Sequence, residues 1–415
     1  MFNLFIDPRQ KIYDFSIFDP IKIILSKKIN EKEISSFFKD KFNFKNTLTV
    51  SQGRLAIYLA VRSIVNNSKN EIILSPYTVF DIVNMVLCAG GKPVFADIEF
   101  PSLSISINSI KKNISNRTAG IILTHYHSYS SNLTEIVNLA KSNNIKIIED
   151  CAQVFGTKSN SNFVGNFSDI SIFSFNITKF ISTLSGGVLV CNDDQIFNKI
   201  VEYSNEFKIN PLLFLFKKYL KAVQIKIFTS KILFNIFTRW IIRFTLKSQF
   251  KIFKDLVRTD PDPKMFTKLP KYYNSYVTNF QRKDILTKIN NYLTSNKQEI
   301  RLNNYLYYQE KLSEVKEITI HKIKKDTLNG VVTFPFFYRE RDKLYEFLIR
   351  NNCDVSKYFY RDCSSLNIYR NYSNKCENSI KACNEVILLP LYPGYKRESM
   401  IKNIEKIKSF FNKNN

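Results

Sequence analysis

Residues 145–187, IKIIEDCAQVFGTKSNSNFVGNFSDISIFSFNITKFISTLSGG, contain two apolar runs that decide the fold. The first run, residues 145–148, predicts a strand buried on both faces and leads directly to the carboxylate of Asp150. The second run, residues 170–175, predicts a similar strand and is followed by Lys179. Because ligands of open α/β sheets lie beyond the carboxyl ends of the strands, we expect Asp150 and Lys179 to face one crevice.

Three side chains at this edge, Asp150, Ser174 and Lys179, offer a partner for a cation, a hydroxyl donor and an amine. An amine that is shielded from water loses its proton more readily and attacks an aldehyde. An aspartate that pairs with a pyridinium nitrogen keeps that ring an electron sink. The trio therefore predicts Schiff-base chemistry with pyridoxal phosphate. The alternatives are an aspartate that caps a helix and a lysine on a solvated loop.

Two segments in this stretch, EDCAQ and FSFNITK, resemble motifs of the DegT/DnrJ/StrS sugar aminotransferases, a family of fold type I pyridoxal-phosphate enzymes. The resemblance implies that Asp150 pairs with the pyridine nitrogen and that Gln153 lies beside the ring. It also implies that Ser174 binds the cofactor phosphate and that Lys179 is the Schiff-base lysine. Sugar 3-dehydratases of the family carry histidine in place of that lysine, so Lys179 indicates the aminotransferase branch.

A glycine turn, SQGRLAIYLA from Ser51, precedes a predicted apolar helix. Free backbone N–H groups at a helix start bind phosphate without a special side chain. The turn is similar to the family's G-T-S-A-L segment, which implies that Gly53, Arg54 and Leu55 hold the cofactor phosphate. Arg54 stands where threonine is common. Three interpretations stay open for it: a contact with the cofactor phosphate, a contact with the substrate's phosphates, and an exposed arginine without a ligand.

The segment PYTVF contains the position at which the family stacks an aromatic ring on the cofactor. Val79 stands at that position, so Tyr77 and Phe80 are the candidates to supply the ring, and core packing is the alternative for Phe80. Farther along, His125 and His127 follow a buried strand, where we expect a pocket wall, and both are candidate substrate contacts. Two histidines without a third ligand do not make a zinc site, so we predict no metal.

A later segment, LPKYYNSYVTNFQ, is similar to the family's G-Y-N-Y-R-M-S-E-L-Q motif. In the family the asparagine reaches the neighbouring subunit's cofactor phosphate, so the resemblance implies a homodimer in which Asn274 has that role. Tyr276 replaces the family's substrate-binding arginine and is a candidate substrate contact. An exposed aromatic lead-in to a helix is the alternative.

Composition narrows the class of protein. The 415 residues suffice for two domains, and 44% hydrophobic with 23% charged residues indicate a globular chain. A net charge of +25 is typical of proteins that bind nucleic acid or an anionic membrane, yet the sequence contains no recognisable nucleic-acid-binding module. The seven cysteines are scattered along the chain, and the first segment, MFNLFIDPRQ, does not resemble a signal peptide. Both observations predict a cytoplasmic protein.

Residues 211–257 are rich in Leu, Ile and Phe, contain basic residues every few positions, and are acidic only at Asp255. No apolar run there reaches the roughly 18 residues of a membrane-spanning helix. The pattern predicts a pair of basic amphipathic helices that contact an anionic membrane, which would place the protein at the inner face of the membrane. A helical hairpin that covers the body of the protein or joins two subunits is the alternative.

The expected fold is therefore α/β, a fold type I pyridoxal-phosphate transferase with a mostly parallel seven-stranded sheet, a small α/β domain and a basic helical insertion. We expect a lead-in at 1–45, a large domain at 46–205, the insertion at 206–265 and a small domain at 266–415. The resemblance implies transfer of an amino group from glutamate to a nucleotide-linked keto-sugar for surface polysaccharide. A lipid-linked acceptor and a non-catalytic membrane scaffold are the competing hypotheses.

Overall fold

The computed structural model describes most of the chain, namely residues 6–9, 15–24, 28–127, 132–159, 162–247, 262–323, 330–357 and 360–412. The part of the expected insertion from 248 to 261 lies outside the described residues. Within the described residues, no helix is both long enough and apolar enough to cross a membrane.

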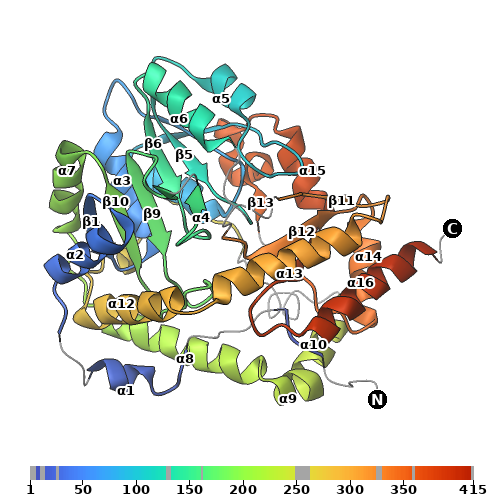
Figure 1. Ribbon diagram of the computed structural model, residues 1–415. Coiled ribbons are helices and arrows are strands. Elements are labelled where there is room, and N and C mark those ends of the chain that lie inside the picture. The colour runs from blue at the N-terminus through green and yellow to red at the C-terminus, as the bar shows by residue number, and fades with distance from the viewer. Residues whose placement is uncertain are drawn as a thin grey trace.

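A seven-stranded sheet in the order β1-β10-β9-β6-β5-β2-β4 forms the centre of the molecule (Figure 1). Its strands are β1 (Asn46–Val50), β2 (Glu71–Leu74), β4 (Lys92–Phe95), β5 (Thr118–Thr124), β6 (Lys146–Asp150), β9 (Ile170–Ser174) and β10 (Gly187–Cys191). The pairs from β4 to β9 are parallel, and only β10 runs antiparallel to its neighbours β9 and β1. The expected mostly parallel seven-stranded sheet is confirmed.

Helices cover both faces of this sheet because its strands are apolar on both faces. On one face, α3 (Gly53–Ile64), α4 (Phe80–Cys88) and α7 (Asp194–Ser204) share a core with Ile72 and Leu74 of β2. On the other face, α5 (Ile107–Asn113) and α6 (Leu133–Ser142) pack with Ile73, which stands between Ile72 and Leu74 in β2. Alternate side chains of a strand point to opposite faces, so a single apolar run serves both layers.

A smaller antiparallel sheet has the strand order β11-β12-β14. It consists of β11 (Thr319–Ile320), β12 (Thr333–Phe337) and β14 (Val386–Pro390), and α13 (Lys297–Leu312), α14 (Arg341–Arg350) and α16 (Arg397–Asn412) share its core. Short elements connect the two sheets: β3 (Tyr77–Thr78) pairs with β13 (Arg361–Asp362), next to α15 (Glu377–Glu385). The remaining short elements are β7 (Lys158–Ser159), β8 (Asn162–Phe163), η2 (Lys271–Tyr273), η3 (Cys363–Ser365) and η4 (Asn367–Tyr372).

A row of helices lies along the lower edge of the molecule in Figure 1. It is made of α1 (Asp19–Ile24), α8 (Leu212–Phe228) and α9 (Lys231–Leu233), and η1 (Phe234–Thr238) and α10 (Arg239–Lys247) follow α9 and contact each other. The basic stretch thus forms the two expected helices, α8 and α10, with a short π-helical turn between them. Helix α8 runs beside α12 (Asn279–Leu293), which packs with α2 (Glu31–Phe42) under β9 and β10.

Helix α12 places a buried carboxylate under the loop that follows β9. Asp284 is 3% exposed, and its Oδ2 accepts a hydrogen bond of 3.3 Å from the backbone amide of Leu184. Burial raises the pKa of Asp284 from its ordinary value of 3.8 to about 7, although Lys288 one turn later acts in the opposite direction. The Lys288 ammonium instead pairs with Asp19 of α1, at 2.7 Å.

This carboxylate makes the stability of the protein depend on pH. The folded protein binds more protons at Asp284 than the unfolded chain does between pH 4 and 7, so its contribution is complete below pH 4 and is lost as pH rises through about 7. An Asp284→Asn variant cannot ionise and keeps an oxygen for the Leu184 amide. We expect its free energy of unfolding, relative to the unchanged protein, to increase by on the order of 2–3 kcal/mol between pH 5 and 8.

Urea denaturation at the two pH values measures this difference. Glu202→Gln, at an exposed position of α7, is the control and is expected to leave the pH dependence unchanged. Parallel stability profiles for Asp284→Asn and the unchanged protein would show that Asp284 does not titrate in this way.

Candidate active site

The carboxyl ends of β6 and β9 bring the predicted polar residues together. β6 ends at Asp150 and β9 ends at Ser174, and the parallel register pairs Asp150 with Ile172. Lys179 follows in the loop between β9 and β10, where its backbone amide donates to the Asn176 carbonyl at 2.9 Å. The sheet therefore places these three residues along one edge, as the sequence predicts.

The start of α3 lies against this edge with no room for a side chain between them. A Cβ atom added to Gly53 would lie 2.6 Å from both Cβ and Oγ of Ser174. A Cβ atom added to Gly187 would lie 3.1 Å from Cα of Gly53. Gln52, which precedes the helix, makes no side-chain cap, and among the first N–H groups of α3 the Leu55 amide donates to the Gln52 carbonyl at 3.1 Å, so the amides of Gly53 and Arg54 are the donors that the helix start presents. Gly53 and Ser174 thus offer backbone N–H groups and a hydroxyl to one phosphate.

Burial shifts the proton affinities of Asp150 and Lys179 in opposite directions. Burial raises the pKa of Asp150, and the nearby Lys179 ammonium partly offsets this. Burial also lowers the pKa of Lys179; Asp150 opposes the shift and Arg54 adds to it. A desolvated carboxylate favours a cationic partner, and a desolvated amine is a better nucleophile and base.

A second carboxylate, Glu149, holds the end of β6 in place. It is completely buried and accepts three hydrogen bonds, from Nε2 of His125 at 2.9 Å, the Gly165 amide at 3.0 Å and Oγ of Ser168 at 2.9 Å. His125, a predicted substrate contact, is 1% exposed and belongs to this network. One ligand atom each from His125, Glu149 and Cys151 lie within 4.8 Å of one another. Because Glu149 already has three donors, we interpret the group as structural support for Asp150.

A group of tyrosines forms the wall next to Gln153. Tyr77 is 1% exposed and packs against Tyr126, with ring centroids 5.4 Å apart, and against Tyr360 at 5.1 Å. The Gln153 side-chain amide donates to the Tyr360 hydroxyl. Tyr360 comes from the segment before β13 and was not among the predicted residues. A lone tyrosine far along the chain carries no sequence signal of this contact.

The remaining predicted aromatic and histidine residues lie close to this wall. Phe80 is 4% exposed and belongs to the core under α4, whereas Val79 precedes that helix and is partly buried. The His127 ring makes an edge-on contact with the Tyr360 ring, with centroids 6.0 Å apart, and its Nδ1 contacts Oγ1 of Thr333 at 2.7 Å. Burial lowers the pKa of His127 to about 3, so its imidazole is neutral at physiological pH.

Arg54 is anchored by residues that the sequence did not single out. Its Nη1 lies 2.8 Å from Oδ2 of Asp81 on α4 and donates to the Tyr273 hydroxyl at 3.2 Å. The Arg54 side chain nevertheless keeps 45% of its surface exposed. Leu55, next in the helix, is buried at 1% exposure and packs in the core.

The segment around Asn274 is tied to the same helix start. Oγ of Ser275 donates to Oγ of Ser51 at 3.0 Å, and Nε2 of Gln281 donates to the Ser51 carbonyl at 3.2 Å. Oδ1 of Asn274 accepts a hydrogen bond of 3.3 Å from the Lys208 amide. Tyr276 is 40% exposed. The structure therefore brings this segment next to the start of α3.

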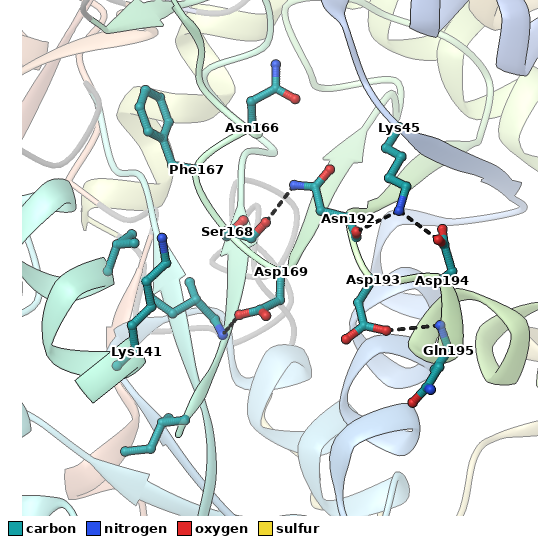
Figure 2. Close-up of a pocket in the computed structure, with 14 residues that line it drawn as sticks. Lys45, Lys141, Asn166, Phe167, Ser168, Asp169, Asn192, Asp193, Asp194 and Gln195 are labelled. Carbon is teal, nitrogen blue, oxygen red and sulfur yellow. Dashed lines mark hydrogen bonds and ion pairs between the residues drawn. The ribbon is translucent and has the colours of Figure 1, made fainter. Parts of the chain in front are cut away.

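A hollow lies at the other end of the sheet, near the starts of β6 and β9 (Figure 2). Its volume is about 740 Å³. Its acidic side chains already have partners: Lys45 pairs with Asp194 at 2.7 Å, and Lys146 pairs with Asp169 at 2.9 Å. Figure 2 shows Lys45 directed at Asn192 and Asp194. This hollow is remote from the candidate active site.

Comparison with a family model matches residues 25–208 and 274–408, which is more than half of the chain. The model is described as the DegT/DnrJ/EryC1/StrS aminotransferase family. It does not match residues 209–273, the part that begins with α8. Both strand ends and the start of α3 lie within the matched residues.

Curated relatives and solved structures agree with this match. The GDP-perosamine synthase of Escherichia coli O157:H7 is 34% identical over 173 residues, which are 41% of this chain and 48% of that protein. The chain spans about half the length of the curated relatives that it matches first. The dTDP-4-amino-4,6-dideoxy-D-glucose transaminase of Shigella dysenteriae is 23% identical over 368 residues, 86% of this chain and 84% of that protein.

Among solved structures, Helicobacter pylori PseC, an aminotransferase involved in the biosynthesis of pseudoaminic acid, superposes with a TM-score of 0.74. The sequence identity is 17%, and the alignment covers 99% of this chain and 100% of that one. This likeness confirms the fold. With the family match, the sheet topology and the residues at its carboxyl edge, it follows that the chain belongs to the DegT/DnrJ/EryC1/StrS aminotransferase family, whose cofactor is pyridoxal phosphate.

Proposed function

We propose that the protein is a pyridoxal-phosphate-dependent aminotransferase that transfers an amino group from glutamate to a nucleotide-linked keto-sugar. The observation that carries the proposal is the placement of Lys179 and Asp150 beside the Gly53–Ser174 contact. An amine, a carboxylate and a phosphate site then lie at one sheet edge, which is the set that the cofactor requires. The names of the two curated relatives above support the nucleotide-linked sugar as acceptor, and we propose polysaccharide synthesis as the pathway on the family resemblance.

Each side chain has a distinct task in this proposal. When bound, pyridoxal phosphate supplies an electron sink for the α-carbon of the amine donor. Lys179, whose pKa is lowered by burial, binds the cofactor covalently and then moves the proton at the substrate carbon. Asp150 holds the charge of the pyridine nitrogen, and Glu149 with His125 fixes the strand that carries Asp150. Gln153 and Tyr360 form the wall of the site beside the pyridine ring.

The assembly that completes the site is also part of the proposal. In the family, the asparagine of the motif that matches Asn274 serves the cofactor phosphate of a neighbouring subunit. In this chain Tyr273 and Ser275 are hydrogen-bonded to Arg54 and Ser51 of the same subunit, so the support for a homodimer is the family motif and not these contacts. We therefore propose a homodimer, with Tyr276 and His127 as candidate substrate contacts.

Replacement of Lys179 tests the reaction. We expect the purified protein with pyridoxal phosphate to show a visible absorbance band that glutamate converts to the spectrum of the aminated cofactor. Lys179→Ala is expected to lack the band and to lose at least 10³-fold in turnover, because the covalent anchor and the proton carrier are one residue. Lys158→Ala, on β7, is the control and is expected to behave like the unchanged protein. An unchanged protein that shows neither band nor conversion would favour a non-catalytic scaffold.

We further infer that the row of helices along one edge of the molecule contacts an anionic membrane. The outward side chains of α8, α9, η1 and α10 are largely apolar: Leu212, Leu213, Phe216, Leu220, Ile227, Phe228, Ile232, Leu233, Ile236, Phe237, Trp240 and Phe244 are each at least 41% exposed. Helix α1 adds Ile21, and the turn before it adds Ile17 and Phe18. The Tyr219 hydroxyl of α8 donates to the Ile17 carbonyl at 3.2 Å, which joins this segment to α8.

Charge selects lipid over a second copy of the chain as the occupant of this apolar face. Basic residues flank the apolar stripe of α8, and residues 208–254 contain no Asp or Glu. Two copies of the face would bring like charges together, whereas anionic headgroups neutralise them. An enzyme held there would also meet a lipid-linked keto-sugar, the alternative acceptor.

A triple variant tests the membrane contact. Phe216→Glu, Ile236→Glu and Trp240→Glu place three carboxylates on the apolar face, and we expect at least a tenfold loss of binding to phosphatidylglycerol-containing vesicles in sedimentation. Leu293→Glu with Ile401→Glu, exposed apolar residues elsewhere, is the matched control. Equal vesicle binding by the triple variant, or a change in its oligomer mass in place of lipid binding, would contradict the inference.

A further inference from the structure

The first helix of the unmatched segment is built into the wall of the active site. Leu215 and Ala222 of α8 are buried, at 5% and 0% exposure, and share a hydrophobic cluster with Ile177 and Leu184. Ile177 and Leu184 flank Lys179 in the loop after β9. The inner face of α8 therefore packs on the loop that carries Lys179.

The segment before α8 is connected to the start of α3 by a series of hydrogen bonds. The Ile209 amide donates to the Asn274 carbonyl at 3.0 Å. Ile209 stands two residues before Pro211, the residue that directly precedes α8. The segment that contains Asn274 bonds in turn to Ser51 through Ser275, at 3.0 Å. The segment before α8 is thus linked to the start of α3 through residues 274 and 275, while α8 itself packs on the loop of Lys179.

Lys218 occupies the inner side of these turns. It stands three residues after Leu215 and four before Ala222, which places the three on neighbouring positions of one helix face. Within the described part of the chain, the charged groups that act on Lys218 are Lys221 and Arg54, both cations. Burial and these two cations lower the pKa of Lys218 to about 8, which leaves its ammonium mostly charged at pH 7.

Such a cluster of cations is unfavourable without an anion. Asp81 compensates Arg54, and residues 208–254 offer Lys218 no acidic neighbour in the sequence. An ammonium and a guanidinium that act on each other electrostatically are groups that bind phosphate. Two sources of phosphate exist at this site, the cofactor and a nucleotide-linked acceptor.

We propose that Lys218 and Arg54 form a binding site for the diphosphate of the acceptor, so that α8 determines substrate recognition. The assignment rests on the proposed function. The cofactor phosphate is already served by the Gly53 turn and Ser174, which lie in contact with each other. Lys218 lies near the face of α8 that packs on the loop of Lys179 through Leu215 and Ala222, so we assign it to the phosphates of the acceptor.

Binding of free nucleoside diphosphates to the cofactor-loaded protein tests the proposal. GDP, dTDP and UDP are titrated by calorimetry at pH 7 into the unchanged protein and into Lys218→Ala, Lys218→Arg and Lys217→Ala. We expect Lys218→Ala to weaken the binding of the preferred nucleotide about tenfold, the effect of one charge-assisted contact. Lys218→Arg is expected to retain most of the affinity, and Lys217→Ala, at the exposed neighbouring position, all of it.

The two phosphate sources are separated by measuring pyridoxal-phosphate affinity and glutamate conversion of the same variants. Unchanged values for both with weaker nucleotide binding support the proposal. Weaker cofactor binding with unchanged nucleotide binding overturns it and assigns Lys218 to the cofactor. Equal nucleotide affinity in Lys218→Ala and the unchanged protein also overturns it. If the proposed function is wrong, the unchanged protein will not convert its cofactor with glutamate, and this result is distinct from the nucleotide-binding result.

Discussion

The close approach of a helix start to two strands is the constraint on which the site depends. Gly53 lies so near Ser174 and Gly187 that a single methyl group at either glycine would overlap a neighbour, at 2.6 to 2.7 Å. This contact sets the first N–H groups of α3 against the end of β9. It also fixes where the loop from Ser174 to Gly187 begins and ends, and Lys179 lies on that loop. A phosphate site and an amine are thereby placed by the same backbone contact.

Burial gives these groups their chemistry. A lysine on a solvated loop stays protonated, whereas the desolvated Lys179 has a lowered pKa. Asp150 is kept at the same edge by Glu149, whose three hydrogen bonds satisfy a carboxylate that would otherwise be costly to bury. The loop with Lys179 rests on α12 below and α8 outside, so the family core and the segment outside the family match both shape the site.

Much of this arrangement could be predicted from local sequence. The apolar runs before Asp150 and around Ile170–Ser174 specify strands buried on both faces, and the parallel sheet then brings their ends together. The contacts of Tyr360 with Gln153 and of Tyr273 with Arg54 could not be predicted in this way. They join residues more than 200 positions apart, and nothing in either local segment marks the partner. The inner role of Lys218 was hidden for a different reason, because a basic residue in an amphipathic helix is typical of a solvated face.

The central claim is that Lys179, among the many lysines of the chain, forms the covalent link to pyridoxal phosphate. Borohydride reduction of the protein loaded with one equivalent of cofactor, followed by proteolysis and mass spectrometry, locates that link directly. We expect one modified peptide, the peptide that contains Lys179, and its loss when Lys179 is replaced by alanine. A cofactor adduct on another lysine, or label spread evenly over surface lysines, would contradict the account.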